Sequence, residues 1–168
     1  MFSLNELNTN LSSSGNELLI VFLLAMLPIT ELRLSIPYGI LYLGLTPISA
    51  LVVSLVGNFI ISLPLIYIFN YIKSYTENHP SFSFIHRFLY RYSTKKYRKY
   101  NYLKRYGLIL FVGIPFPGTG AWSGSLVASF LGLGKSYSRG CIFAGLVISS
   151  VATTLLTVYG HLMWLSIK

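Results

Sequence analysis

The stretch PITELRLSIP, from Pro28 to Pro37, decides how this chain folds. It lies inside an apolar run, residues 18–45, whose only charges are Glu31 and Arg33. An ionisable group at membrane depth costs at least about 2.5 kcal/mol, so it is seldom kept without a use. The prolines at both ends break the helix, and broken backbone is tolerated at that depth only where protein or a water-filled cavity covers it. We therefore expect a broken membrane helix that places Glu31 at a binding site.

The composition is that of an integral membrane protein. Of the 168 residues 54% are apolar and 10% are charged, and the mean hydropathy is +0.63. The formal net charge is +9, and nine of the 13 Lys and Arg residues lie between Lys73 and Arg105. We expect this basic segment to be cytoplasmic and to contact anionic lipid headgroups, with an amphipathic surface helix near residues 82–92. Because attraction to anionic lipid is a sufficient reason for the positive charge of this segment, we expect no nucleic-acid partner.

Four apolar stretches follow a polar tail at residues 1–17, which ends in a capping box, Ser14-Gly-Asn-Glu17, predicted to start the first helix. They cover residues 18–45, 48–72, 107–133 and 140–165. A membrane span needs about 20 apolar residues, and the second and fourth stretches provide them without interruption. The first and third are interrupted in the middle. We predict that each of these two is a re-entrant hairpin of two half-helices.

The distribution of charge favours the hairpin topology. If the third stretch returns to the side where it began, Lys135 and Arg139 join the basic loop at residues 73–106. Eleven of the 13 basic residues are then cytoplasmic. Four simple spans would place Lys135 and Arg139 outside, and would explain less of the pattern.

A weak internal repeat supports the same topology. Sliding the chain by 88 residues aligns the Leu-Gly-Leu triplets at 43–45 and 131–133, Gly57 with Gly145, and Glu31 with Thr119. The predicted fold is an all-α integral membrane protein with two inverted repeats. Each repeat is a re-entrant hairpin followed by a transmembrane helix, and the basic cytoplasmic helix lies between the repeats.

The second hairpin has its own tip, PFPGTGAWSGS at residues 115–125. Its prolines lack a backbone donor and its glycines permit positive φ. Thr119 is suited to cap the helix that follows, whose N-terminus favours an anionic group. A packing corner without a ligand would use the same residues. The residues assigned a structural role at the first tip (Pro28–Pro37) and second tip (Pro115–Gly124) are Pro28, Pro37, Pro115, Pro117 and Gly124.

Two motifs resemble those of a known family. E-x-R-x-x-I-P occurs as Glu31, Arg33, Ile36 and Pro37, and P-x-P-G-T-G-A-W-x-G occurs from Pro115 to Gly124. Both resemble the putative small multidrug export family of membrane proteins, and the likeness runs from about residue 18 to residue 160. The resemblance implies export of a small molecule. The layout is more distantly similar to the DedA-type membrane proteins, which use paired re-entrant hairpins and are linked to lipid flipping. Those proteins carry arginine in the second hairpin, where residues 118–125 have none.

We predict a substrate or ion site at the membrane midplane, between the two tips. Its members are Glu31, Arg33, Ser35, Asn58, Gly118, Thr119, Gly120 and Trp122. In this interpretation Glu31 takes up and releases a proton. Alternatively, Glu31 and Arg33 only neutralise one another. Residues two apart do not face each other on a regular helix, so such a pair requires irregular backbone. Asn58 shares one helix face with Ser54 and Ser62, which we expect to turn inward.

The predicted function is secondary transport of a small molecule, coupled to protons. A lipid flippase and a non-transporting scaffold are the alternatives. We expect no enzyme, metal or cofactor, because the sequence holds no nucleophile–base set, phosphate loop or metal-ligand cluster. The single cysteine excludes an internal disulfide. The chain is too small to enclose a pathway alone, so we expect a homodimer, in a bacterial plasma membrane or an organellar membrane of bacterial origin.

Overall fold

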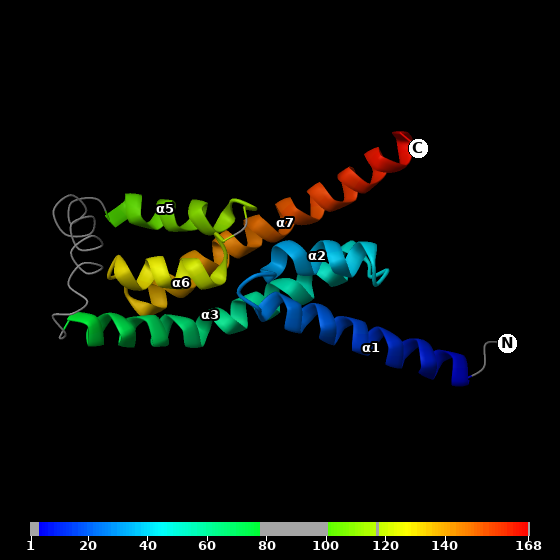
Figure 1. Ribbon diagram of the computed structural model, residues 1–168, viewed down its shortest axis with the longest axis horizontal. Helices are drawn as coiled ribbons and strands as arrows, with labels where there is room; N and C mark the ends of the chain where they lie inside the picture. Colours follow the sequence, from blue (N-terminus) through cyan, green and yellow to red (C-terminus); the bar gives the residue numbers. More distant parts are fainter. Residues whose placement is uncertain (1–3, 78–100, 117, 168) are drawn as a thin grey trace. The chain divides into compact units, whose positions relative to one another are not determined.

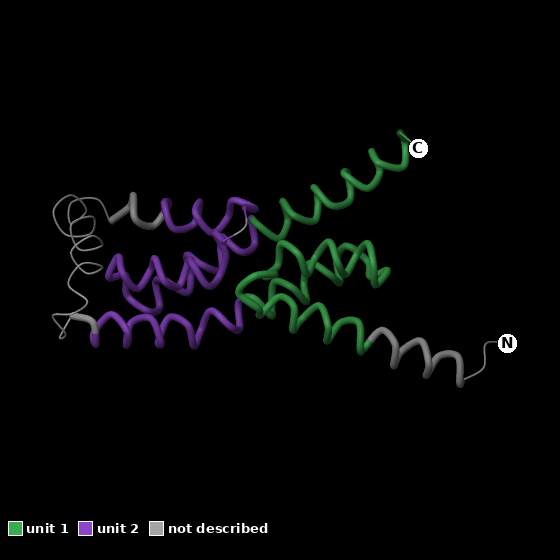
Figure 2. The backbone as a smooth tube through the Cα atoms, in the orientation of Figure 1, with its two compact units in different colours: residues 1–58, 149–168 green, residues 59–148 purple. Residues whose placement is uncertain are grey.

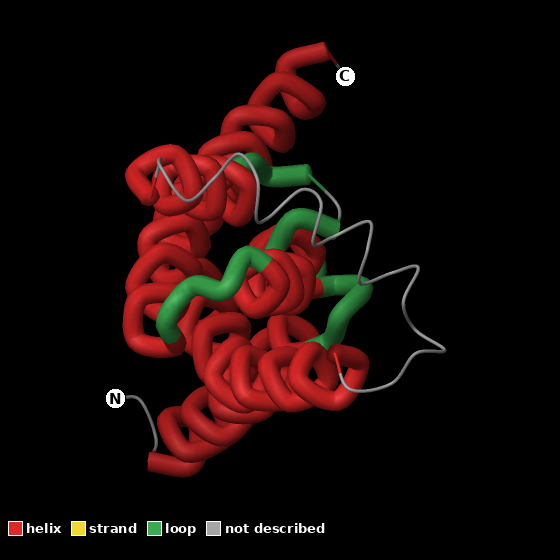
Figure 3. Tube along the Cα trace, turned by 90° about the vertical axis from the view of Figure 1, so that its left-hand side faces the viewer, coloured by secondary structure: helices red, strands yellow, loops and turns green. Residues whose placement is uncertain are grey.

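The computed structural model describes residues 4–77, 101–116 and 118–167, and every regular element in these ranges is an α-helix (Figures 1 and 3). The helices are α1 (Leu4–Met26), α2 (Glu31–Leu41), α3 (Pro47–Glu77), α5 (Asn101–Gly113), α6 (Ala121–Phe130) and α7 (Lys135–Ile167). The all-helical fold class is thus confirmed for this part of the chain. The amphipathic helix predicted near residues 82–92 lies outside the described residues.

Two helices are long and apolar enough to cross a membrane. α3 has 31 residues and α7 has 33, which correspond to about 46 and 50 Å of helix, against a hydrocarbon core of about 30 Å. Only 33% of the most apolar window of α3 and 44% of that of α7 are buried inside the protein. The other residues of these windows are partly or fully exposed, as expected for helices that are surrounded by lipid.

The other described helices are too short or too polar to span alone. α2 has 11 residues, α6 has 10 and α5 has 13, so each extends about 15–20 Å. The apolar part of α1 is Gly15–Met26. α1 itself begins at Leu4, so the predicted capping box lies inside the helix, and its assignment as the helix start is wrong. Leucines at positions 4, 7 and 11 recur at helical spacing and continue the helix upstream of the box.

The chain divides into two compact units, drawn in different colours in Figure 2. Unit 1 comprises Met1–Asn58 and Ser149–Lys168, and unit 2 comprises Phe59–Ile148. Unit 1 therefore contains α1, α2, the first part of α3 and the last part of α7. Unit 2 contains the rest of α3 and α7, together with α5 and α6. Each unit thus combines two other helices, α1 and α2 or α5 and α6, with a part of each of the two longest helices, α3 and α7.

The helix pattern of the first half recurs in the second half. α3 begins at Pro47 and α7 begins 88 residues later, at Lys135. The turns that precede them contain Gly44 and Gly132, and both glycines have a φ of 67°. A side chain is unfavourable at that left-handed backbone angle, which explains glycine at both positions. The two predicted repeats therefore share helix order and turn geometry, while their inverted orientation stays a prediction.

Close glycine packing also recurs within the two units. A Cβ atom on Gly57 of α3 would lie 2.7 Å from the carbonyl oxygen of Phe22 in α1. A Cβ atom on Gly145 of α7 would lie 2.6 Å from the Cβ atom of Val112 in α5. Since real Cβ atoms do not approach so closely, α3 packs on α1, and α7 packs on α5, at these distances only because glycine is present.

In unit 2 the end of α6 lies beside the end of α3. The Lys73 ammonium group donates a hydrogen bond of 3.2 Å to the carbonyl oxygen of Ser129. One turn earlier on α3, the Asn70 amide donates to the Ser129 hydroxyl at 3.2 Å and to the Ile66 carbonyl at 2.7 Å. α6 therefore ends at the level where α3 leads into the basic segment.

Candidate functional site

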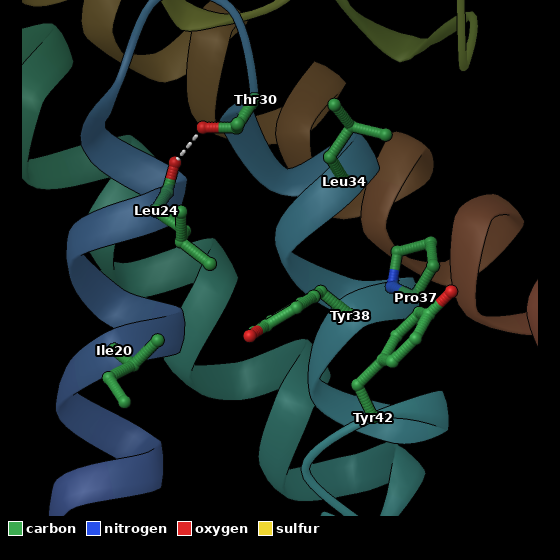
Figure 4. A pocket seen from close by; sticks show the side chains of 7 residues that line it. All are labelled: Ile20, Leu24, Thr30, Leu34, Pro37, Tyr38 and Tyr42. Carbon is green, nitrogen blue, oxygen red and sulfur yellow. Dashed lines mark hydrogen bonds between the residues drawn. The ribbon is translucent and has the colours of Figure 1, made fainter.

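The helix break at the first tip lies between α1 and α2 and centres on Glu31. The Thr30 hydroxyl donates a hydrogen bond to the carbonyl oxygen of Leu24, near the end of α1 (Figure 4). The Glu31 amide donates to the Leu27 carbonyl at 3.1 Å. Glu31 has a φ of 45°, the only positive value for a residue other than glycine in the described part of the chain. Such a conformation costs about 1–3 kcal/mol and is concentrated at functional sites.

Glu31 and Arg33 form a buried ion pair. The carboxylate oxygen Oε2 of Glu31 lies 2.6 Å from Nη1 of Arg33. The side chains are 3% and 8% exposed, respectively. Residues two apart point away from each other on a regular helix, so the left-handed backbone at Glu31 is what lets the two side chains meet. The pair brings a carboxylate and a guanidinium into the interior with no net charge.

The structure corrects the predicted role of Pro37. This residue lies inside α2 and not at the break, which occupies residues 27–30 and contains Pro28. A proline inside a helix removes one backbone hydrogen bond, but membrane helices tolerate this where neighbouring groups satisfy the backbone. Pro28 alone therefore marks the end of the first arm, and α2 runs on through Pro37 to Leu41.

Two contacts fix the register between α2 and α3. The Ser35 hydroxyl donates to the Ser54 hydroxyl at 2.8 Å. A Cβ atom on Gly39 would lie 3.3 Å from the Cβ atom of Ala50. From Ser35 to Gly39 the residue number on α2 rises, while that of the contacted residue on α3 falls from 54 to 50, so the two helices are antiparallel. One turn beyond the serine pair, α2 carries Glu31 and α3 carries Asn58, so the two residues lie at the same level of the helix pair.

Asn58 is fully buried, yet its side-chain amide group makes no hydrogen bond. The residue is 0% exposed, and neither Oδ1 nor Nδ2 has a partner. Leaving such a group unsatisfied costs about 1–3 kcal/mol, and native proteins rarely do so without a reason. Ser54 and Ser62 on the same face are also 0% exposed, so the expected inward orientation of this stripe is observed. Asn58 is the member of this stripe whose side-chain polar atoms have no hydrogen-bond partner.

Further buried hydroxyls in unit 1 were missed by sequence reasoning. Ser149 and Thr153, one turn apart on α7, are 0% and 6% exposed, and their hydroxyl oxygens have no hydrogen-bond partner. The neighbouring face of α7 carries Ser150, Thr154, Thr157 and His161. On that face Ser150 is buried and His161 is exposed. The stretch SSVATT, residues 149–154, carries hydroxyls on both faces, so periodicity alone does not identify the inner one.

An apolar groove of about 510 Å³ lies between α1 and α2. It is lined by Ile20, Leu24, Thr30, Leu34, Pro37, Tyr38 and Tyr42 (Figure 4). The rings of Tyr38 and Tyr42 stack with centroids 5.4 Å apart, and Tyr38 extends from α2 toward α1. Sequence reasoning missed this groove. The available signal was the helical spacing of Leu34, Tyr38 and Tyr42 next to the charged motif.

The second tip, in unit 2, connects α5 to α6. The Thr119 hydroxyl donates to the carbonyl oxygens of Ile114 and Phe116, 2.9 Å from each. The N-cap of α6 is Gly120, and no side chain caps this helix. The prediction that Thr119 caps α6 is therefore wrong, because its hydroxyl closes the preceding turn. Gly118 in this turn has a φ of 85°.

The remaining predicted residues of the second tip have mainly packing contacts. A Cβ atom on Gly124 would lie 2.5 Å from Cγ2 of Val112, so α6 approaches α5 closely at this glycine. Trp122 is half-buried in the first turn of α6, and Pro115 is exposed in the connection. Pro117 lies outside the described residues. In the described ranges, no group of three His, Cys, Asp or Glu side chains is placed to hold a metal ion.

The structure brings together one half of the predicted site. Glu31, Arg33, Ser35 and Asn58 all belong to unit 1, where the two contacts between α2 and α3 place them on neighbouring turns. Gly118, Thr119, Gly120 and Trp122 belong to unit 2. A joint site between the two tips stays a prediction.

Comparison with known proteins assigns the chain to one family. The family model described as putative small multi-drug export protein matches residues 31–152. The match begins at Glu31 and includes both tip motifs, which confirms the resemblance drawn from the sequence. No curated protein matches the chain, and no solved structure matches it.

Proposed function

Because the chain belongs to the family of putative small multi-drug export proteins, we propose that it is a secondary transporter that exports a small molecule. The two membrane-length helices and the family both fit a membrane protein. The observation that carries the proposal is the Glu31–Arg33 pair, buried at a helix break with Glu31 in a left-handed conformation. Broken helices with ionisable residues are the usual construction of substrate and ion sites in transporters.

In the proposed mechanism Glu31 is the coupling residue. Its carboxylate holds Arg33 at 2.6 Å in the resting state. Protonation removes the charge from the carboxyl group, weakens the pair and leaves Arg33 available to a new partner. The antiparallel register places the unpartnered Asn58 amide at the same level, so it is positioned to contact whatever enters. Proton uptake and substrate binding at one site would then be linked.

We further propose that α5 and α6 form a re-entrant hairpin. Neither helix reaches the roughly 30 Å of a full crossing. The Lys73–Ser129 hydrogen bond supports a return of α6 to the side where α3 ends. Lys135 lies with its ammonium nitrogen 4.5 Å from the ring centroid of Tyr67 on α3, and this contact supports a start of α7 on that side as well. The basic residues on both sides of the hairpin are then cytoplasmic.

The test is proton movement that depends on an added solute. The purified protein is reconstituted into liposomes that contain an entrapped pH dye, and small organic anions, cations and neutral solutes are added in turn. We expect at least one solute to drive proton movement with the wild-type protein and none with Glu31→Gln. Liposomes carrying Ser49→Ala serve as the control, because Ser49 is partly exposed and its hydroxyl bonds to Thr46 in the turn before α3. Equal proton movement with wild type and Glu31→Gln would remove Glu31 from the mechanism.

A further inference from the structure

We propose that the site formed by Glu31, Arg33 and Asn58 binds a monovalent organic anion together with a proton. Protonation of Glu31 transfers the Arg33 guanidinium from the carboxylate to the anionic group of the ligand. This inference rests on the proposed function and specifies the chemical class of its substrate. It follows from the charge balance of the site, from the kind of polar atoms gathered there, and from the groove beside it.

Charge balance decides which ligand the buried pair accepts. In the resting state the carboxylate and the guanidinium cancel, and both side chains are less than a tenth exposed. The guanidinium cannot be deprotonated in a protein, so only Glu31 changes its charge. A cation added to the resting pair would leave one net positive charge buried, and an anion alone would leave one negative charge. Each is costly away from water. A proton and a monovalent anion bound together leave the site neutral.

The polar atoms at the site are mainly donors. The Arg33 guanidinium has five N–H groups, and the Asn58 amide adds two that have no partner. α2 begins at Glu31, so the partial positive charge of a helix N-terminus lies at the same place. These groups favour an anion and oppose a cation. The Asn58 oxygen, also without a partner, is the acceptor that a protonated Glu31 requires.

Other ionisable groups in unit 1 do not alter this balance. Among the described residues α1 carries Glu17, which is partly exposed, and residues 47–58 of α3 carry none. The end of α7 carries Tyr159 and His161, both exposed. Tyr38 of α2 and Tyr42, which follows the helix, line the groove. Arg33 is the charged group that contacts the Glu31 carboxylate, at 2.6 Å.

The groove between α1 and α2 offers a place for the apolar part of the ligand. Thr30, which precedes α2, and Leu34 of α2 line it, and in the sequence these two residues flank Glu31 and Arg33. Its volume of about 510 Å³ accommodates a small aromatic body. The stacked tyrosines at one end provide flat apolar surface. An aromatic monoanion therefore satisfies both the charge and the shape of this region.

Calorimetric titration of the purified protein in detergent tests the inference. The probe is benzenesulfonate, which stays ionised at all working pH values, and benzyltrimethylammonium is the cation of similar size. Each is titrated at several pH values in two sulfonate-free buffers that differ in ionisation enthalpy. We expect benzenesulfonate to bind with uptake of about one proton, and its affinity to rise about tenfold per pH unit of acidification while free Glu31 is ionised. We expect no binding of the cation.

Three single variants and one double variant assign the roles. Glu31→Gln imitates the protonated side chain, so it should bind benzenesulfonate at every pH without proton uptake. Arg33→Gln should weaken binding about a hundredfold. Because this change leaves Glu31 buried without its counter-charge, Glu31→Gln/Arg33→Gln is measured beside it, and it should lose binding to the same extent. Asn58→Leu should weaken binding about tenfold.

Two results would overturn the inference. Binding of the cation with proton release, and not of the anion, would show exchange of a cation for a proton. The substrate class would then be wrong while the coupling role of Glu31 stands. Absence of benzenesulfonate binding, or binding without proton uptake, would remove the proton–anion site. In that case the proton-movement assay in liposomes decides separately whether Glu31 couples transport at all.

Discussion

Replacing Asn58 by leucine should make the protein more stable and its transport weaker. Asn58 is 0% exposed, and neither polar atom of its amide has a hydrogen-bond partner. Leucine has similar size and needs no partner, so the substitution removes an unsatisfied group from the interior. A residue kept for structure would behave in the opposite way. The expected gain in stability is therefore the sign that Asn58 is retained for a ligand.

The magnitude follows from the two unsatisfied atoms. A buried amide without partners costs about 1–3 kcal/mol in protein mutational data, and Asn58→Leu should recover most of that free energy. Asn70 on the same helix is the matched control, because its amide donates to the Ile66 carbonyl at 2.7 Å and to the Ser129 hydroxyl at 3.2 Å. Asn70→Leu breaks these bonds and should lower stability by about 1–2 kcal/mol.

Thermal unfolding of the two variants and the wild type in the same detergent measures both effects. For a domain of this size 1 kcal/mol corresponds to a shift of about 2–4 °C in the midpoint. We expect a higher midpoint for Asn58→Leu and a lower one for Asn70→Leu, with solute-driven proton movement reduced in the first. If Asn58→Leu lowers the midpoint as Asn70→Leu does, the Asn58 amide has a structural partner. The assignment of its amide to a ligand would then be refuted.

Two further predictions concern packing and topology. Gly57→Ala places a Cβ atom against the backbone oxygen of Phe22 and should lower stability by about 1–3 kcal/mol in the same unfolding assay. The control Gly15→Ala has open space around it and should leave the unfolding midpoint unchanged or raise it. Equal shifts of the midpoint in the two variants would contradict the close approach of α3 to α1. Single cysteines at Ser74 and Ser136, both exposed, should react with an impermeant thiol reagent from the same side of the membrane in a Cys141→Ser background. Reaction from opposite sides would restore four simple spans and exclude the α5–α6 hairpin.

The charged half of the site is predictable from local sequence, because a buried charge and a broken helix both appear within PITELRLSIP. The need for irregular backbone between Glu31 and Arg33 also follows from helix geometry, and the left-handed φ of Glu31 fulfils it. Pro37 was assigned to the break because proline usually ends a helix. The packed surroundings of α2 override that preference, which local sequence does not record.

The surroundings that leave the Asn58 side chain buried without a partner come from residues far away in the sequence. They depend on the pairing of α2 with α3, in which Ser35 meets Ser54 across 19 positions of sequence. A polar stripe on α3 is visible in the sequence, but it does not reveal which member is left without a partner. Thr119 illustrates a similar limit, because a threonine before a helix usually caps it, and here the hydroxyl bonds to the preceding turn instead.

The most direct test compares Glu31→Gln with the double variant Glu31→Gln/Arg33→Gln in abundance and in solute-driven proton movement. A transporter that cycles through protonated Glu31 must tolerate a neutral side chain there. We therefore predict that both variants fold and accumulate normally and that neither couples solute to proton movement. If the pair is only a structural lock, Glu31→Gln leaves Arg33 buried without its counter-charge at a cost of about 3–5 kcal/mol. Depletion of the single variant, with abundance and activity both restored in the double variant, would contradict the proposed role of Glu31.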